Sequence, residues 1–326
     1  MNAEIFAEWL RRQGHSVVKT TSSYWFDAAP RVYQAFPYHW VIKPPDEELL
    51  NLLREKRALA LRYSTTADNP VGCISYHTVC DQHNYTLNEL HSGSRQNVRK
   101  GLNNCSIEQL SFEYVAKKGW LLEKDTASRQ GRNTTLSEEQ WHHRYMAAAD
   151  LPGFEAWGAL VDDQLAAALL VVQIDNCYEI ISQQSLRNYL KTRVNHALTF
   201  AVTQKIMNRD GTRFIHYGVQ SLDAPESVDE YKILLGYKAK PVRQRVVFHP
   251  LATPFFNKFT YEVVRWMRSG MHKNAFLRKL EGILRFYLNG KLPSAEQVLP
   301  ECLMDRKFEL IEAMNLHKKA PNKPAN

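Results

Sequence analysis

The segment that most constrains the fold covers residues 178–218, where a strand, a helix and a second strand are predicted in succession. Residues 178–182 alternate with the two-residue period of a strand. Apolar residues then recur at three- and four-residue spacing from Val194 to Ile206, which is typical of one helix face. Residues 213–218 form the next predicted strand, after a glycine at position 211 that suits a helix end. This order favours two parallel strands joined by a crossover helix.

The start of the crossover helix is a candidate anion site. In a strand–helix–strand unit the helix begins beside the strand ends, and its first N–H groups have no partner inside the helix. Together with the helix dipole, these groups favour a phosphate. Arg187, Lys191 and Arg193 precede the helix and add positive charge there.

The predicted elements around this unit complete a mixed α/β arrangement. Upstream, residues 156–161, 165–174 and 177–183 are predicted as three strands, and the Asp and Asn residues between them favour tight turns. Downstream, a short helix at 227–235 precedes a strand at 241–249. We therefore expect an antiparallel meander that is followed by a parallel strand.

The chain divides by pattern into three parts. Residues 1–118 are predicted as a divergent N-terminal α/β half, and residues 119–250 hold the unit described above. Residues 251–326 are predicted as a basic helical extension with a polar tail. The helices expected in this extension cover residues 255–267, 274–288 and 306–316.

Composition and charge restrict the classes of function. The longest apolar run, residues 165–172, is too short to cross a bilayer, and Glu4 and Glu8 interrupt the apolar N-terminal residues, unlike a signal peptide. These features predict a cytoplasmic protein. The five cysteines are odd in number and scattered, which is unlike a disulfide framework. A net charge of +8 suits an anionic partner such as a phosphorylated cofactor, nucleic acid or an acidic membrane surface.

Two short motifs flank the central unit. Residues 94–101 read Ser-Arg-Gln-Asn-Val-Arg-Lys-Gly and are predicted as a basic helix, whereas residues 231–237 read Tyr-Lys-Ile-Leu-Leu-Gly-Tyr. They resemble the "R-x-N-[IV]-R-K" helix and the "[FY]-K-x-x-[FL]-G" segment of the FemAB-like branch of the GNAT (Gcn5-related N-acyltransferase) enzymes. That branch includes domains known as BioF2-like acetyltransferases. The resemblance covers residues 76–249 and depends on the order of the two motifs.

This resemblance implies an α/β (α+β) fold with a GNAT-like mixed sheet, flanking helices and two GNAT-like halves, followed by the helical extension. In a GNAT fold the last meander strand and the parallel strand diverge, so that the pantetheine arm of acyl-CoA can lie along the first of them. The pyrophosphate then sits at the helix start. The residues that the resemblance places at the cofactor are Ile181, Ser182, Gln183, Arg187, Lys191, Arg193, Val194 and Asn195.

Candidate catalytic residues lie at the end of the parallel strand and in the second motif. Acyl transfer needs a polarised carbonyl and a proton for the leaving group. His216 and Tyr217 end the strand, beside the expected gap, and the alternative interpretation of His216 is a core histidine with its hydrogen bonds satisfied. Tyr231 and Lys232 supply a phenol and an ammonium that can protonate a leaving group or stabilise an oxyanion. Lys232 matches the lysine of the family motif and is therefore favoured, while Asp229 is predicted to cap its helix.

The basic helix is the predicted contact for an anionic part of the acceptor or the donor, because arginine forks match phosphate oxygens. A solvated helix with no ligand is the alternative interpretation. The residues assigned to substrate binding are Arg95, Asn97, Arg99 and Lys100, together with Asp223 on the loop after the parallel strand.

No metal site is predicted. Cys73, His77, Cys80 and His83 are residue types that bind metals, but on a strand Cys80 would point away from Cys73 and His77. Structural zinc sites also usually show tighter paired spacing.

The sequence leaves three functions open. The favoured one is transfer of an acyl group from acyl-CoA to an amine or hydroxyl of a small molecule or of a cell-envelope or polysaccharide precursor. GNAT enzymes usually carry a "[QR]-x-x-G-x-[GA]" turn at the helix start, yet residues 191–196 hold no glycine, so the backbone approaches a phosphate less closely. Two alternatives therefore stay open. One is transfer from aminoacyl-tRNA, although enzymes of that kind often carry a coiled-coil arm and the sequence shows no sustained heptads. The other is a non-catalytic binding module of the same shape.

The C-terminal helices combine apolar residues such as Phe276 and Leu284 with basic ones such as Arg278 and Arg285. We predict that they pack back onto the catalytic core. Peripheral contact with a membrane surface is the alternative, and the breadth of the apolar face argues against it.

Overall fold

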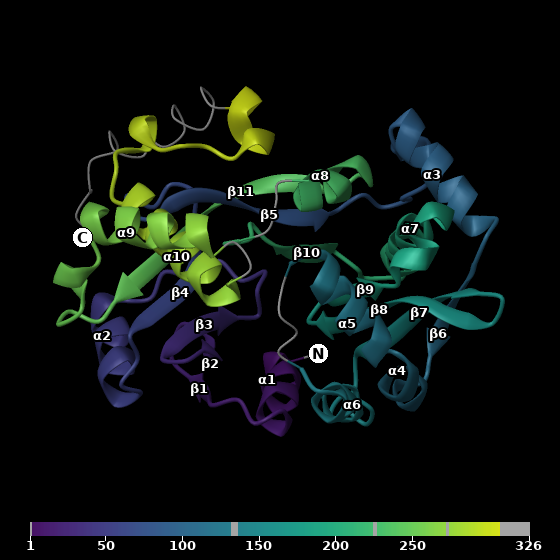
Figure 1. Ribbon diagram of the computed structural model, residues 1–326, viewed down its shortest axis with the longest axis horizontal. Helices are drawn as coiled ribbons and strands as arrows, with labels where there is room; N and C mark the ends of the chain where they lie inside the picture. The colour runs from purple at the N-terminus through teal and green to yellow at the C-terminus, as the bar shows by residue number, and fades with distance from the viewer. Residues whose placement is uncertain (1, 132–135, 224–226, 272–273, 307–326) are drawn as a thin grey trace, which may run out of the picture.

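Figure 1 shows a computed structural model of the chain, which describes residues 2–131, 136–223, 227–271 and 274–306. Its strands form one mixed sheet of eleven strands in the order β1-β2-β3-β4-β11-β5-β10-β9-β8-β7-β6. The strands are β1 (Val17–Lys19), β2 (Tyr24–Ala29), β3 (Val32–Phe36), β4 (Ala60–Thr65), β5 (Cys73–Cys80), β6 (Ser106–Leu110), β7 (Phe154–Val161), β8 (Gln164–Ile174), β9 (Cys177–Ser185), β10 (Phe214–Val219) and β11 (Lys238–Phe248).

Helices cover both faces of this sheet. The α-helices of the described residues are α1 (Ala3–Arg12), α2 (Asp46–Glu55), α3 (Ser92–Leu102), α4 (Phe112–Lys118), α5 (Trp120–Arg129), α6 (Glu138–Met146), α7 (Val194–Met207), α8 (Ser227–Leu234), α9 (Lys258–Gly270) and α10 (Ala275–Asn289). Among the described residues, no helix has both the length and the apolar character that crossing a bilayer requires.

The predicted central unit is confirmed. Strands β7, β8 and β9 form an antiparallel meander, β10 pairs with β9 in parallel, and α7 connects the two. The first motif forms α3, and the second lies in α8 and the turn that follows it. The local sequence predicted these elements even though β8 is buried on both faces and α7 is buried on most of its surface.

The two ends of the chain interleave in the sheet. Strand β11 pairs antiparallel with both β4 and β5, so a strand from the C-terminal side lies between two N-terminal ones. Strand β6, which precedes residue 118, pairs with β7 at the far edge. The division at residues 118 and 250 stays a prediction, and each group of strands contains an element from the other side of residue 118.

Apolar clusters on the two faces hold the helices in place. On one face, Val98 of α3 and Leu198 of α7 pack with Ile180 and Ile215 of the diverging strands. On the other face of β8, Leu170 packs in a second cluster that also holds residues of α1, α4 and α6. The sheet alternation therefore separates two cores.

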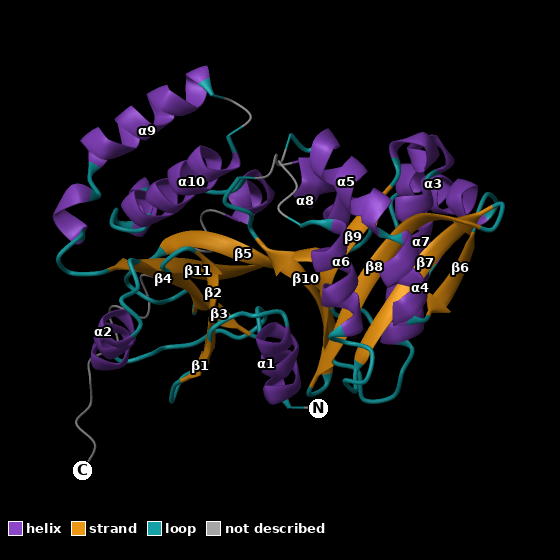
Figure 2. Cartoon of the chain, turned by 60° about the horizontal axis from the view of Figure 1, so that its bottom comes forward, coloured by secondary structure: helices purple, strands orange, loops and turns teal. Residues whose placement is uncertain are grey.

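The C-terminal extension lies over β4 and β11. Leu284 and Phe286 of α10 are buried with Val246 and Phe248 of β11, which confirms that α10 packs back onto the sheet. Helix α9 forms an outer layer over α10, and α2 covers the opposite side of these strands (Figure 2). The helix predicted at 306–316 falls, apart from its first residue, outside the described residues.

Candidate functional site

Strands β9 and β10 diverge after a short parallel pairing. The pairing runs from Phe214 opposite Cys177 to His216 opposite Glu179, whereas β9 continues to Ser185. Beyond Glu179, the described pairings of β9 are with β8 alone. Strand β10 turns away at Gly218, whose φ of 102° is rarely adopted by other residues, and its register with β5 shifts there. The divergence that the family resemblance implies is therefore present.

A β-bulge decides which side chains of β9 face α7. Ile180 pairs with Val171 and Ser182 pairs with Leu170, so Ile181 is the extra residue. Ile181 packs against the cluster on the α1 side of the sheet. The bulge resets the alternation, and Gln183 consequently faces α7, where its Oε1 accepts a hydrogen bond from Thr199 Oγ1 at 2.9 Å. Strict alternation would have placed Gln183 on the same face as Ile181.

Polar side chains fill the opening between β9, β10, α7 and α8. We call this group the wedge cluster, and its members are Gln183, Asn195, Thr199, Tyr217 and Tyr231. Tyr217 Oη donates to Gln183 Oε1 across the gap between the strands. Tyr231 Oη donates to the Asn195 carbonyl at 2.8 Å and lies 3.0 Å from Thr199 Oγ1. A ligand arm that entered between β9 and β10 would have to replace some of these bonds.

Lys232 is buried next to the wedge cluster. Its Nζ donates to Asp229 Oδ1 at 2.8 Å, and Asp229 Oδ2 accepts from Tyr76 Oη at 2.6 Å. Nζ also lies 4.9 Å from the centre of the Tyr217 ring. The Lys232 and Asp229 side chains are only 11% and 10% exposed, so water screens this ion pair weakly. Lys232 therefore offers a fixed positive charge beside Tyr217.

Burial keeps the neighbouring phenols protonated. It raises the pKa of Tyr217 well above its usual range, and the nearby Tyr231 and Asp229 raise it further. Burial raises the pKa of Tyr231 as well. Both phenols are therefore neutral at physiological pH and able to donate a hydrogen bond or a proton. Burial, assisted by Arg193, lowers the pKa of His196 to about 4, so the imidazole beside the Tyr231 ring is neutral.

The start of α7 combines unpartnered N–H groups with basic side chains. Arg193 precedes the helix with φ 67° and ψ 28° and makes no side-chain cap. Val194 and Asn195 follow it, and the first N–H groups of any helix lack intrahelical acceptors. Lys191 and Arg193 are exposed, and neither forms a salt bridge within the described part of the chain. Arg187 differs from them, because its Nε lies 3.9 Å from Asp125 Oδ1.

The basic helix α3 lies against the start of α7. A Cβ at Gly101 would stand 2.6 Å from the Arg193 carbonyl oxygen and 2.8 Å from Ala197 Cβ, so only glycine permits this approach. The residues of α3 assigned to substrate binding are the half-buried Arg95 and Asn97 and the exposed Arg99 and Lys100. No salt bridge to the three basic ones is found among the described residues. The fold thus places their charge close to the α7 start.

His216 is separated from Tyr217, with which sequence analysis grouped it. The two residues are adjacent on β10 and point to opposite faces of the sheet, as alternation requires. The His216 ring centre lies 4.9 Å from that of His77, and its Nδ1 lies 4.0 Å from Glu179 Oε1. His216 therefore lies away from the wedge cluster, in a buried row of polar side chains.

This polar row takes one residue from each of five neighbouring strands. Its members are Ser64, Gln244, His77, His216 and Glu179. Glu179 Oε1 accepts from the backbone N–H of His39 at 2.8 Å. Burial lowers the pKa of His77 to about 3 and holds the pKa of His216 well below its usual value. The charges of neighbouring histidines lower both pKa values further. The two imidazoles of the row are therefore neutral at physiological pH.

Asp223 lies on the α10 side of the sheet. The neighbouring Leu222 carbonyl accepts from Arg285 at 3.0 Å, and Ser221 Oγ lies 3.3 Å from Asp223 Oδ1. Burial lowers the pKa of Arg62 to about 10, and the charge of Asp223 opposes that lowering. The charge of Asp223 therefore acts on Arg62, on the side of the sheet that α10 covers.

Three members of this site were not predicted from the sequence as site residues. Thr199 is not among the apolar residues that defined the predicted face of α7, and Tyr76 lies 153 positions before Asp229, so no local pattern indicates either contact. Asp229 was predicted to cap its helix, but its carboxylate instead pairs with Lys232 and Tyr76. The three-residue spacing from Asp229 to Lys232 was the available signal for that pair.

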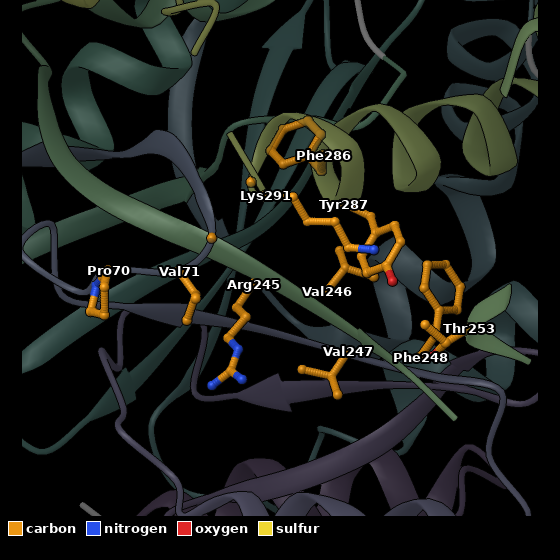
Figure 3. Close-up of a pocket in the computed structure, with 12 residues that line it drawn as sticks. Pro70, Val71, Arg245, Val246, Val247, Phe248, Thr253, Phe286, Tyr287 and Lys291 are labelled. Carbon is orange, nitrogen blue, oxygen red and sulfur yellow. The ribbon is translucent and has the colours of Figure 1, made fainter. Parts of the chain in front are cut away.

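A separate hollow of about 330 Å³ opens between β11 and the end of α10. Figure 3 shows Arg245, Phe248 and Tyr287 among its lining side chains. None of the predicted site residues lines it.

Comparison with known proteins concerns the fold. No protein-family model matches the chain, and no curated protein matches it in sequence. A crystal structure of FemX matches with a TM-score of 0.52 and 11% identity over 76% of this chain and 92% of that one. The C-terminal DUF2156 domain of a putative lysylphosphatidylglycerol synthetase from Agrobacterium fabrum matches with a TM-score of 0.51 and 11% identity, over 74% and 87%.

A tandem GNAT protein from the clavulanic acid biosynthesis pathway matches with a TM-score of 0.43 and 12% identity, over 72% of this chain and 82% of that one. At such identities the first two likenesses show a shared fold. The predicted fold class, a GNAT-like mixed sheet with flanking helices, is confirmed.

Proposed function

We propose that this protein is an acyltransferase that moves an acyl group from acyl-CoA to an amine or hydroxyl of an anionic acceptor. The observation that carries the proposal is the divergence of β9 and β10, with Lys232 and Tyr217 at its edge and the start of α7 beside it. The opening can admit the thioester, the positive charge can stabilise the oxyanion, and the neutral phenol can protonate the leaving group, which are the functions that acyl transfer requires.

The donor would enter as an added strand along β9. Its extended arm would take the edge of Ser182 and Gln183 that β10 leaves unpaired, as in strand addition to a sheet. The pyrophosphate would meet the first N–H groups of α7 at Val194 and Asn195, with Lys191 and Arg193 nearby. The wedge cluster would open to admit the arm.

Lys232 and Tyr217 would divide the chemistry. Attack by the acceptor forms a bond from its nitrogen or oxygen to the acyl carbon and places negative charge on the carbonyl oxygen, which the Lys232 ammonium stabilises. The carbon–sulfur bond then breaks, and the thiolate takes the proton of Tyr217. The proton that the acceptor loses restores the phenol, so the residues return to their initial state. Asp229 and Tyr76 hold the Lys232 ammonium in place.

The acceptor is proposed to be anionic, such as a cell-envelope or polysaccharide precursor. The basic side chains of α3 lie beside the α7 start without salt-bridge partners in the described residues, and guanidinium groups match phosphate oxygens. One structural neighbour is named for phosphatidylglycerol, an anionic lipid, which agrees with an acceptor of this charge.

A second candidate function is transfer from aminoacyl-tRNA. It is favoured by the non-glycine residue Arg193 at the start of α7, which limits close approach of the backbone to a pyrophosphate. The hydrogen bonds that close the wedge cluster also suit a large polyanionic donor that lies on the surface, as do the basic residues of α3, for which the described part of the chain offers no salt-bridge partner.

Isothermal titration with acetyl-CoA, a long-chain acyl-CoA and charged tRNA separates these functions. The proposal predicts saturable heat with an acyl-CoA, and the double variant Lys191→Gln/Arg193→Gln should bind it about tenfold more weakly. Lys117→Gln, an exposed lysine on α4, is the matched control.

The two other functions predict different results. Heat with charged tRNA and none with acyl-CoA would replace the proposal by the second candidate. Acyl-CoA binding without a mass increase in any offered acceptor would indicate a binding module.

A further inference from the structure

The outer face of α9 carries large apolar side chains that remain exposed. Phe259 and Trp266 are 78% and 76% exposed, and Leu251 and Phe255, which precede the helix, are 81% and 70% exposed. We call this set the α9 stripe, and its members are Leu251, Phe255, Phe259, Val263, Trp266 and Met267. Single exposed apolar residues are common on proteins, whereas several large ones exposed along one segment indicate an interaction surface.

The stripe follows from the helical period. Phe259, Val263 and Trp266 are spaced by four and three residues and therefore share one face. The opposite face anchors α9 to the protein, since Val264 is buried and Tyr261 Oη donates to Glu281 of α10 at 3.1 Å. In Figure 2, α9 is the outermost layer above α10. The stripe is thus a ridge on a helix that the fold holds in position.

Charge along α9 is predominantly positive. Lys258 and Arg265 flank the stripe, and Arg268 donates to Glu281 beneath it at 2.9 Å. The acidic residue of α9 is Glu262, whose Oε2 lies 3.5 Å from Arg265 Nη1. The whole chain carries a net charge of +8. Aromatic residues on one face of a helix and basic ones at its flanks are typical of a helix that lies in a membrane interface.

We propose that the α9 stripe docks on an anionic membrane surface, with α9 parallel to the plane of the bilayer. Phe259 and Trp266 enter the boundary between headgroups and acyl chains, and Lys258 and Arg265 stay at the level of the lipid phosphates. A projecting ridge suits a soft lipid surface, whereas a protein partner would need a matching groove. The inference does not depend on the acyl donor or on the transfer chemistry.

Sedimentation with large vesicles tests the docking, using the full chain without donor. We expect binding to vesicles of 70% phosphatidylcholine and 30% phosphatidylglycerol, and much weaker binding to pure phosphatidylcholine. The double variant Phe259→Gln/Trp266→Gln should bind at least about tenfold more weakly, because it loses the buried aromatic area. The double variant Lys258→Gln/Arg265→Gln should lose mainly the preference for phosphatidylglycerol.

Val298→Gln is the matched control, because Val298 is 76% exposed and lies outside the stripe. Since every substituted side chain is exposed, far-ultraviolet circular dichroism should be unchanged, and Val263→Glu provides an independent disruption of the stripe. Equal vesicle binding by the wild type and both stripe variants would overturn the proposal. The proposal would also be overturned if the wild type did not bind vesicles and light scattering showed a dimer that the F259Q/W266Q substitutions dissociate. A second copy of the chain would then cover the stripe.

Discussion

Lys232 shows how one buried charge can serve a reaction. A buried lysine needs a partner, and Asp229 supplies it while Tyr76 donates a hydrogen bond to the second carboxylate oxygen. The charge therefore stands in a fixed position before any substrate arrives. Fixed charges in weakly solvated sites stabilise developing charge more than mobile ones do.

Removing this charge should reduce the rate of transfer. We expect Lys232→Met to lower kcat by about 10²–10³-fold, with a smaller effect on the KM for the donor, because the charge acts on the oxyanion. Lys238→Met is the control, since Lys238 is exposed and pairs with Asp81 at 3.1 Å. Steady-state kinetics measures kcat and KM separately. An undiminished kcat in a folded K232M protein would exclude Lys232 from the chemistry.

The polar row should make the stability of the protein depend on pH. An unfolded histidine titrates near pH 6.5, whereas burial lowers the pKa of His77 to about 3. Between these values the unfolded chain binds a proton that the folded chain does not, so stability falls as the pH falls. The slope is about 1.4 kcal/mol per pH unit for each such histidine.

Urea denaturation at pH 7 and pH 5 measures this effect. The free energy of unfolding should be lower at pH 5, and His77→Gln should show a smaller difference between the two pH values. Glutamine keeps a group that can bond to Ser64 Oγ, which lies 2.7 Å from His77 Nε2. An identical pH dependence in the two proteins would contradict the assignment to His77.

At the level of elements, a single glycine sets the distance between α3 and α7. Gly101→Ala would place a methyl group 2.6 Å from the Arg193 carbonyl oxygen. We expect a loss of about 1–3 kcal/mol in the free energy of unfolding, because the helices must move apart. We also expect weaker donor binding, because Arg193 begins the proposed anion site.

Gly93→Ala on the same helix provides the control. The nearest atom to its added methyl group would be His91 Nδ1 at 3.9 Å, so no helix has to move. Alanine is the better helix former, and G93A should be as stable as the wild type or slightly more stable. Equal stability of G101A and G93A in urea denaturation would show that the close approach of α3 is not required.

At the level of the whole molecule, one sheet joins the two halves of the chain. Because β11 lies between β4 and β5, the N-terminal strands depend on a segment that follows them by more than 150 residues. A fragment of residues 1–118 would lack β11, and the facing backbone groups of β4 and β5 would have no partners.

We therefore expect this fragment to remain unfolded or to aggregate, whereas the full chain folds. The dispersion of amide signals in NMR spectra of the fragment provides the measurement, with residues 1–250 as the comparison because they include β11. Dispersed, native-like signals from residues 1–118 alone would show that the N-terminal half is autonomous.

Local patterns in the sequence predicted the meander, the parallel pair, the crossover helix and the basic helix. The crossover helix and the strand before it depend on periodicities of 3.6 and two residues, and the meander depends on apolar runs separated by Asp and Asn turns. Neighbouring residues express such signals without help from the rest of the chain. The family resemblance, not a local pattern, assigned Gln183 and Asn195 to the cofactor and favoured Lys232, while the end of the predicted parallel strand and the second motif made Tyr217 and Tyr231 candidates.

The tertiary structure alone decided which of these side chains meet. The bulge at Ile181 turned Gln183 toward α7, strand alternation separated His216 from Tyr217, and the packing of α8 on β5 joined Asp229 to Tyr76. The exposure of the α9 stripe likewise followed from the layer that α9 occupies over α10. Such contacts join residues distant in sequence, so they depend on how the whole sheet packs, which a local pattern does not encode.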